Sequence, residues 1–117
     1  RCAQHTHVST QNNLYLNEIA GENRLWLNSG PAAALGLADG DWVEVSSSWG
    51  AGKIKAQVSD LIHPEAAFML HGFGHQAPGA SRSFGRGLAD GLLMENVSDL
   101  IGGSPALHHT FVSVRPA

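Results

Sequence analysis

Apolar and polar residues alternate along two stretches of the chain, Trp42–Ser46 and Lys53–Val58. In the first stretch Val43 and Val45 share one face, and in the second every even position is apolar. A period of two residues is typical of strands that bury one face. The glycine-containing segment Trp49–Gly52 lies between the two stretches, so the pattern predicts a β-hairpin.

The remaining apolar runs are short and are separated by turn-forming residues. They predict a helical turn over Leu14–Ile19, a strand over Arg24–Asn28, a short helix over Ala32–Leu35, a strand buried on both faces over Ala66–Leu70, a turn or helix over Leu88–Leu93 and a closing strand over Thr110–Arg115. Ser29 or Gly30 is the expected N-cap of the short helix, and Gly36 its end. The sum is a mainly β fold, a small barrel with one or two short helices.

Composition narrows the class of protein. At 117 residues with 43% apolar side chains, we expect one folded domain, spanning residues 1–117. A net charge of −3 without a basic run argues against nucleic acid as a partner. The one cysteine, Cys2, leaves no internal disulfide, and no apolar segment is long enough to cross a membrane. Because the chain starts at Arg1 without a leader, we expect it to be a piece of a longer protein.

Three polar segments, 5–13, 71–87 and 95–104, follow apolar or strand-like runs, and a barrel could bring them to one rim. In the first, H-T-H-V-S-T-Q-N-N, eight of nine side chains can form hydrogen bonds, so it is either a solvated loop or the lining of a polar site. We favour the site. Glycines in the second segment let main-chain N–H groups approach an anion, and Arg82 and Arg86 could add charge.

Other side-chain chemistry is weakly indicated. The histidine pairs lack the cysteine or carboxylate companions of a metal motif, so we expect hydrogen-bonded or exposed histidines. Asp39 and Asp41 are interpreted as turn and N–H-capping residues. Trp26 and Trp42 could stack a ligand ring, but we expect them to be packed in the interior. No residue is predicted to be catalytic.

Several motifs together resemble the C-terminal molybdopterin-dinucleotide-binding domain of the molybdenum and tungsten oxidoreductases related to dimethyl sulfoxide reductase. They are H-T-H-V-S-T-Q-N-N, E-N-R-L-W-L-N, A-A-A-L-G-L-A-D-G-D-W-V-E-V, H-G-F-G-H, N-V-S-D-L-I and G-S-P-A-L-H-H-T-F-V-S-V. They cover essentially the whole chain in the expected order. T-Q-N-N and H-G-F-G-H are most similar to the thiosulfate and polysulfide reductase branch. The resemblance implies a double-psi β-barrel that lacks its first strand, which dimerisation or strand exchange could replace.

Position by position, the resemblance implies that one set of residues lines the cofactor, a molybdopterin guanine dinucleotide. The set is His5, Thr6, Ser9, Thr10, Gln11, Asn12, His71, Gly72, Phe73, Gly74, His75 and Asn96, with Asn13 nearby. Ser98 stands where relatives often have a second asparagine. The molybdenum or tungsten would be held by another domain, so the isolated chain is expected to be inactive.

The same resemblance implies a larger assembly. Catalytic and iron–sulfur domains would belong to the parent chain, and electron-transfer and membrane-anchor subunits would be its partners. The parent enzyme is expected in the periplasm, associated peripherally with the membrane, in anaerobic respiration. The alternative is a non-catalytic barrel that binds a protein or peptide. Such a module should present an apolar patch or an open strand edge where this chain has its polar first segment.

Overall fold

Five strands form the framework of the chain in a computed structural model that describes residues 3–5, 8–95, 97–103 and 109–117. The strands are β1 (Leu25–Leu27), β2 (Trp42–Ser46), β3 (Ala51–Val58), β4 (Phe68–Met69) and β5 (Ser113–Pro116). The helices are short: α1 (Leu14–Ile19), α2 (Ser29–Ala34) and the 3-10 turns η1 (Val8–Thr10) and η2 (Asp90–Leu92). The expected mainly β fold with few short helices is confirmed.

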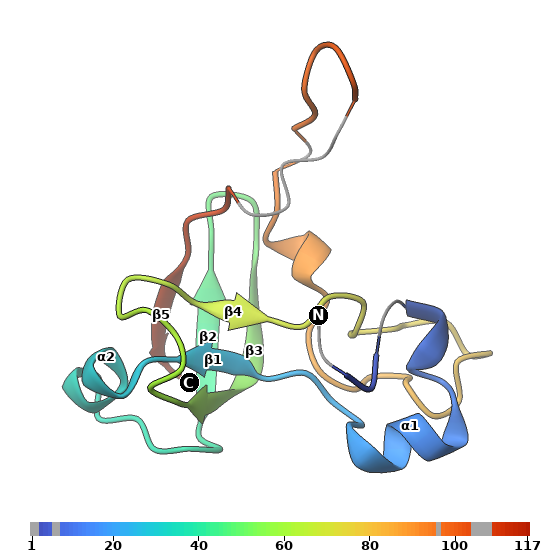
Figure 1. Cartoon of the computed structure of the whole chain (residues 1–117), viewed down its shortest axis with the longest axis horizontal. Helices are drawn as coiled ribbons and strands as arrows, with labels where there is room; N and C mark the ends of the chain where they lie inside the picture. The colour runs from blue at the N-terminus through green and yellow to red at the C-terminus, as the bar shows by residue number, and fades with distance from the viewer. Residues whose placement is uncertain (1–2, 6–7, 96, 104–108) are drawn as a thin grey trace.

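The strands are hydrogen-bonded in the order β4-β1-β3-β2-β5. The first part of β3, residues 51–55, pairs antiparallel with β2, which is the predicted hairpin. Its last part, residues 56–58, pairs in parallel with β1. The two parts of β3 therefore pair with strands that run in different directions, so the five-stranded sheet is bent (Figure 1). Among the described residues the sheet is open, with β4 and β5 at its edges, so closure into a barrel is not seen.

The core lies on one face of this bent sheet. The inward residues of the hairpin, among them Val43, Val45 and Ile54, are at most 1% exposed. They pack with Leu25 and Leu27 of β1. Ala32 of α2 and the side chains of 37, 88 and 93 complete the cluster. The alternation in the sequence therefore predicted correctly which side of each hairpin strand is buried.

Local turn chemistry explains how α2 and the hairpin are joined. The helix is capped by Asn28, whose side-chain oxygen accepts a hydrogen bond from Gly30 N, so the predicted caps were one or two residues late. Gly36 ends the helix with φ +67°, as expected. Asp41 accepts from Ala38 N and Asp39 from Val58 N, which confirms both aspartates as capping residues.

Two predictions of burial were wrong. The apolar run Ala66–Leu70 contributes only the two-residue edge strand β4, and Phe68 is 38% exposed. Trp42, expected in the interior, is 55% exposed and lies under the ammonium group of Lys55. Both side chains lie on the outward face of the sheet, opposite the core, where they stay partly exposed.

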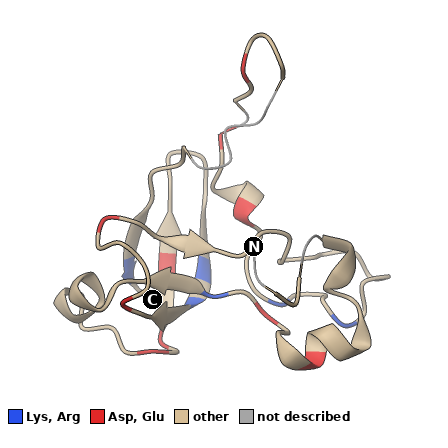
Figure 2. Ribbon diagram, viewed as in Figure 1, with Lys and Arg blue, Asp and Glu red and all other residues tan. Residues whose placement is uncertain are grey.

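The loops form a second half of the molecule beside the sheet. Helix α1 and the irregular loop 71–87 lie together on the right of Figure 1. A separate arm, described for residues 95 and 97–103, projects away from both halves (Figure 1). Its described part does not join the first two polar segments, in contrast to the single rim that we expected for all three. Among the described residues, Lys and Arg are spread over both halves of the ribbon, with Asp and Glu between them (Figure 2).

Candidate functional site

Gln11 joins two polar segments that are sixty residues apart in the sequence. Its side chain is 0% exposed. The amide nitrogen donates to the main-chain oxygen of His71 at 3.0 Å, and the amide oxygen lies 3.1 Å from Nε2 of His75. Because that oxygen can only accept, Nε2 of His75 carries the proton in this pair. The segments 5–13 and 71–75 therefore meet, as predicted, through a buried amide.

Glycines allow the loop 71–75 to pass close to its neighbours. Gly72 has φ +93°, and a Cβ there would lie 2.8 Å from Nε2 of Gln11 and 2.9 Å from a methyl carbon of Val8. Gly74 has φ +78°, and its Cβ would lie 2.2 Å from the main-chain nitrogen of Ala89. Because Gly72 and Gly74 have no side chain, the main chain of the loop 71–75 can pack closely against the neighbouring loops.

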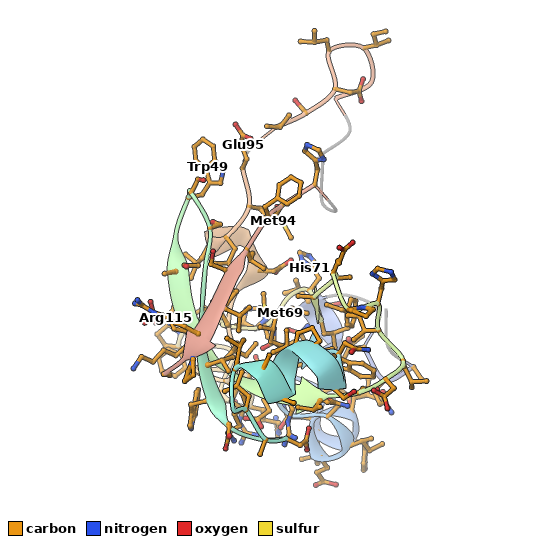
Figure 3. The ribbon with its side chains drawn as sticks, turned by 90° about the vertical axis from the view of Figure 1, so that its left-hand side faces the viewer. Trp49, Met69, His71, Met94, Glu95 and Arg115 are labelled. Carbon is orange, nitrogen blue, oxygen red and sulfur yellow. The ribbon has the colours of Figure 1, made fainter. Side chains whose placement is uncertain are left out.

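His71 is fixed by a buried carboxylate. Its Nδ1 lies 2.7 Å from Oδ2 of Asp90, while Oδ1 of the same carboxylate accepts from the main-chain nitrogen of Gly72 at 3.4 Å. The Asp90 side chain is 9% exposed and that of His71 57% exposed, so the acid is turned inward and the imidazole outward. Figure 3 shows His71 on the body of the molecule, apart from Trp49 and Glu95. The carboxylate of Asp90 therefore fixes the position of the His71 ring.

His5 is built into the interior of the loop half. It is 2% exposed, and its Nε2 donates to the main-chain oxygen of Ala20 at 2.7 Å. Its Nδ1 lies 3.2 Å from the hydroxyl of Thr10. The ring packs edge-on against Phe73, with 5.5 Å between centroids. Both ring nitrogens are thus engaged within the chain, and His5 ties the start of the first segment to α1 and to the loop 71–75.

Two buried asparagines, which the sequence analysis did not single out, hold the loop half together. Asn17, on α1, donates to the main-chain oxygen of Gln11 and accepts from Arg86. Asn23 is 3% exposed and bonds to the main-chain oxygens of Leu70 and Leu88 and to the nitrogen of Leu88. The only sequence signal is an asparagine within the motif E-N-R-L-W-L-N, which does not reveal long-range partners.

The predicted site residues therefore divide into two groups. Four of them are buried, and their direct contact with the cofactor stays a prediction: His5, Gln11, Gly72 and Phe73. The residues that a ligand can reach are exposed or half-buried: Ser9, Thr10, Asn12, His71, Gly74 and His75. Thr6 and Asn96 lie outside the described residues.

The reachable groups fit an anionic, heterocyclic ligand. The segments 5–13 and 71–87 contain no Asp or Glu, and they offer hydroxyls, an amide and imidazoles. These groups donate to phosphate and also suit the mixed edge of a heterocycle. The donor set therefore suits a pterin and its phosphates. Within the described chain, no three His, Cys, Asp or Glu side chains are grouped to hold a metal.

Fold and site together define a β domain whose loop surface is suited to a phosphate-bearing cofactor. The family model named molydopterin dinucleotide binding domain matches residues 1–111. The chain belongs to this family, and its cofactor is molybdopterin dinucleotide. The resemblance seen in the sequence is thereby confirmed.

The chain is similar to parts of much larger proteins. It is 29% identical over 104 residues to the thiosulfate reductase molybdopterin-containing subunit PhsA of Salmonella typhimurium, over 89% of this chain and 14% of the relative. It is also 29% identical over 104 residues to the arsenate respiratory reductase molybdopterin-containing subunit ArrA of Chrysiogenes arsenatis, over 84% of this chain and 12% of the relative. The fold is similar to acetylene hydratase from Pelobacter acetylenicus, with a TM-score of 0.80, 17% identity, and coverage of 100% of this chain and 17% of the other.

Proposed function

We propose that the chain forms one wall of a molybdopterin guanine dinucleotide site in a larger molybdenum-dependent oxidoreductase. The observation that carries the proposal is the buried Gln11, which joins H-T-H-V-S-T-Q-N-N to H-G-F-G-H in a family named for binding of molybdopterin dinucleotide. The bound cofactor supplies the redox-active metal, and the protein supplies position and electrostatics.

Within this role the side chains of the chain have separate tasks. Ser9 and Asn12 donate to phosphate or to the ring edge, and Asp90 holds His71 in position. Gln11 and His5 keep the two loops at a fixed separation. No proton or electron transfer within the chain is required, so we expect the isolated chain to be inactive.

For the parent enzyme we propose reduction of thiosulfate or polysulfide. The similarity to the thiosulfate reductase subunit supports this substrate, and the equal identity to the arsenate reductase subunit makes arsenate the competing one. We propose a periplasmic enzyme, peripheral to the membrane, with iron–sulfur and catalytic domains in the parent chain. Electron-transfer and membrane-anchor subunits complete it. The part of the chain that the structure describes has no helix able to span a bilayer.

We further propose that the open sheet is a double-psi β-barrel without its first strand. Within the described residues, the outer edges of β4 and β5 pair with no further strand, which supports this proposal because an added strand would find main-chain groups to pair with there. Two copies of the fragment could pair with each other through one of these edges. Sedimentation that shows a monomer, together with a closed sheet, would exclude both the missing strand and the homodimer.

The cofactor wall is tested by titrating the 117-residue chain with guanosine diphosphate and following the backbone amide resonances. We expect saturable shifts in 8–13 and 71–75. The variant Ser9→Ala, at an exposed hydroxyl, should weaken them, and Ser48→Ala, an exposed serine in the β2–β3 turn, should not. The absence of any shift in these segments at about 10 mM nucleotide would count against the proposal. It would mean that the binding free energy is weaker than roughly 3 kcal/mol.

A further inference from the structure

A cleft of about 570 Å³ lies beside the candidate cofactor wall and is lined by different residues. Its floor is the outward face of the sheet, and one side is the segment 19–24 that follows α1. Arg86, from the loop 71–87, closes another side. The volume is within the range of roughly 300–1,000 Å³ that small-molecule sites have. Of the predicted cofactor residues, none lines it.

The floor is aromatic because of the register of three strands. Trp26 of β1 lies opposite Phe68 of β4 and Gln57 of β3. The two rings meet edge to face, with centroids 6.0 Å apart and planes at 88°. Within the described chain, neither the Trp26 indole nor the Gln57 amide makes a side-chain hydrogen bond. The floor thus offers a flat ring both an aromatic surface and polar partners.

Cationic groups stand at the sides of the cleft. Arg24 is paired with Glu22 at 3.5 Å, and Glu22 is also bound by Lys55 at 3.1 Å. Arg86 has no carboxylate partner in the described part of the chain, and its NH1 group donates to the neutral amide of Asn17. The lining therefore holds two arginines against one glutamate, which is already neutralised.

Arg86 lies close over Gly21. A Cβ at Gly21 would lie 2.8 Å from NH1 of Arg86. The guanidinium group thus crosses directly over a residue without a side chain and reaches the segment 19–24. Asn17 holds one side of the group, so its remaining N–H donors suit a carboxylate or phosphate in the fork geometry of arginine.

We propose that this cleft binds a small molecule with a flat ring and an anionic carboxylate or phosphate. The ring lies against Trp26 and Phe68, and the anion pairs with Arg86. The site is separate from the proposed cofactor wall, and the inference stands whether or not that wall binds a pterin.

The test follows the amides of 19–24 and the indole N–H of Trp26 by NMR in the 117-residue chain. Probes are indole-3-acetate and guanosine monophosphate, which distinguish a carboxylate source from a phosphate source, with indole and inorganic phosphate as controls. We expect saturation with at least one ring anion, about tenfold weaker binding of neutral indole because the charge-assisted hydrogen bond is lost, and no indole N–H shift with inorganic phosphate.

Two variants and a control locate the site. Arg86→Gln should raise the Kd about tenfold, and Phe68→Leu, at an exposed edge position, should weaken the ring contact. Lys53→Gln removes a cation from the same face of β3 outside the cleft and should leave the Kd within about twofold. The proposal would be overturned if indole and indole-3-acetate bind equally, or if the shifts are confined to 8–13 and 71–75. It would also be overturned by an unchanged Kd in folded Arg86→Gln, or if no probe saturates below about 10 mM.

Discussion

Replacing Gln11 by leucine should separate the two loops of the candidate site. Leucine has a similar volume, so the change opens no large cavity, but it removes both side-chain hydrogen bonds. The main-chain oxygen of His71 loses its amide donor, and a buried unsatisfied group costs about 1–3 kcal/mol. His75 is half-buried, and water can replace its lost partner. We therefore expect a loss of about 2 kcal/mol in the free energy of unfolding.

Urea denaturation followed by tryptophan fluorescence measures this loss. With a slope of about 2 kcal/mol per molar urea, the midpoint should fall by roughly 1 M. The matched control is Gln76→Leu, the same substitution at an exposed position of the loop 71–87, which should change stability by less than about 0.5 kcal/mol. If Gln11→Leu shifts the midpoint no more than Gln76→Leu does, the buried amide does not hold the loops together.

Three further changes test neighbouring features. Gly72→Ala should lower stability by about 1–3 kcal/mol, because φ is +93° and the added Cβ would touch the glutamine amide, whereas Gly79→Ala, in open space, should be nearly neutral in the same urea assay. In Asp90→Asn, the new amide oxygen should accept from Gly72 N and the new NH₂ group should donate to Nδ1 of His71. His71 must then carry its proton on Nε2, and unchanged ¹⁵N shifts of the His71 ring would contradict this. Leu100→Ser, at a fully exposed tip of the arm (103%), should leave the free energy of unfolding within about 0.5 kcal/mol, and a larger loss would mean that the arm packs.

Local sequence signals predicted the parts of the fold that depend on near neighbours. The alternation in Trp42–Ser46 gave the buried face of β2, and Gly36 gave the end of α2. The run Ala66–Leu70 was misjudged because hydropathy reports what a residue prefers, not whether another element is available to cover it. Neither the outward face of the sheet nor its open edges can be read from such a run.

The candidate site was predicted as a set of segments, and its internal order was not. The meeting of 5–13 with 71–75 followed from the resemblance and from the position of polar segments after strands. That Gln11 points inward depends on partners sixty residues away, and no pattern within H-T-H-V-S-T-Q-N-N marks it. Asn23 was missed for the same reason, since its three bonds reach Leu70 and Leu88.

The division between buried and reachable residues changes how substitutions in this site should be interpreted. Gln11 and His5 have their polar side-chain atoms engaged within the chain, so their removal can affect a ligand only by moving the loops. Stability and ligand binding should then fall together. Ser9 is exposed, and its removal should weaken binding while the free energy of unfolding stays within about 0.5 kcal/mol. A plot of binding loss against stability loss therefore separates residues that build the wall from residues that touch the cofactor, and a Ser9→Ala variant that loses both would place Ser9 in the first group.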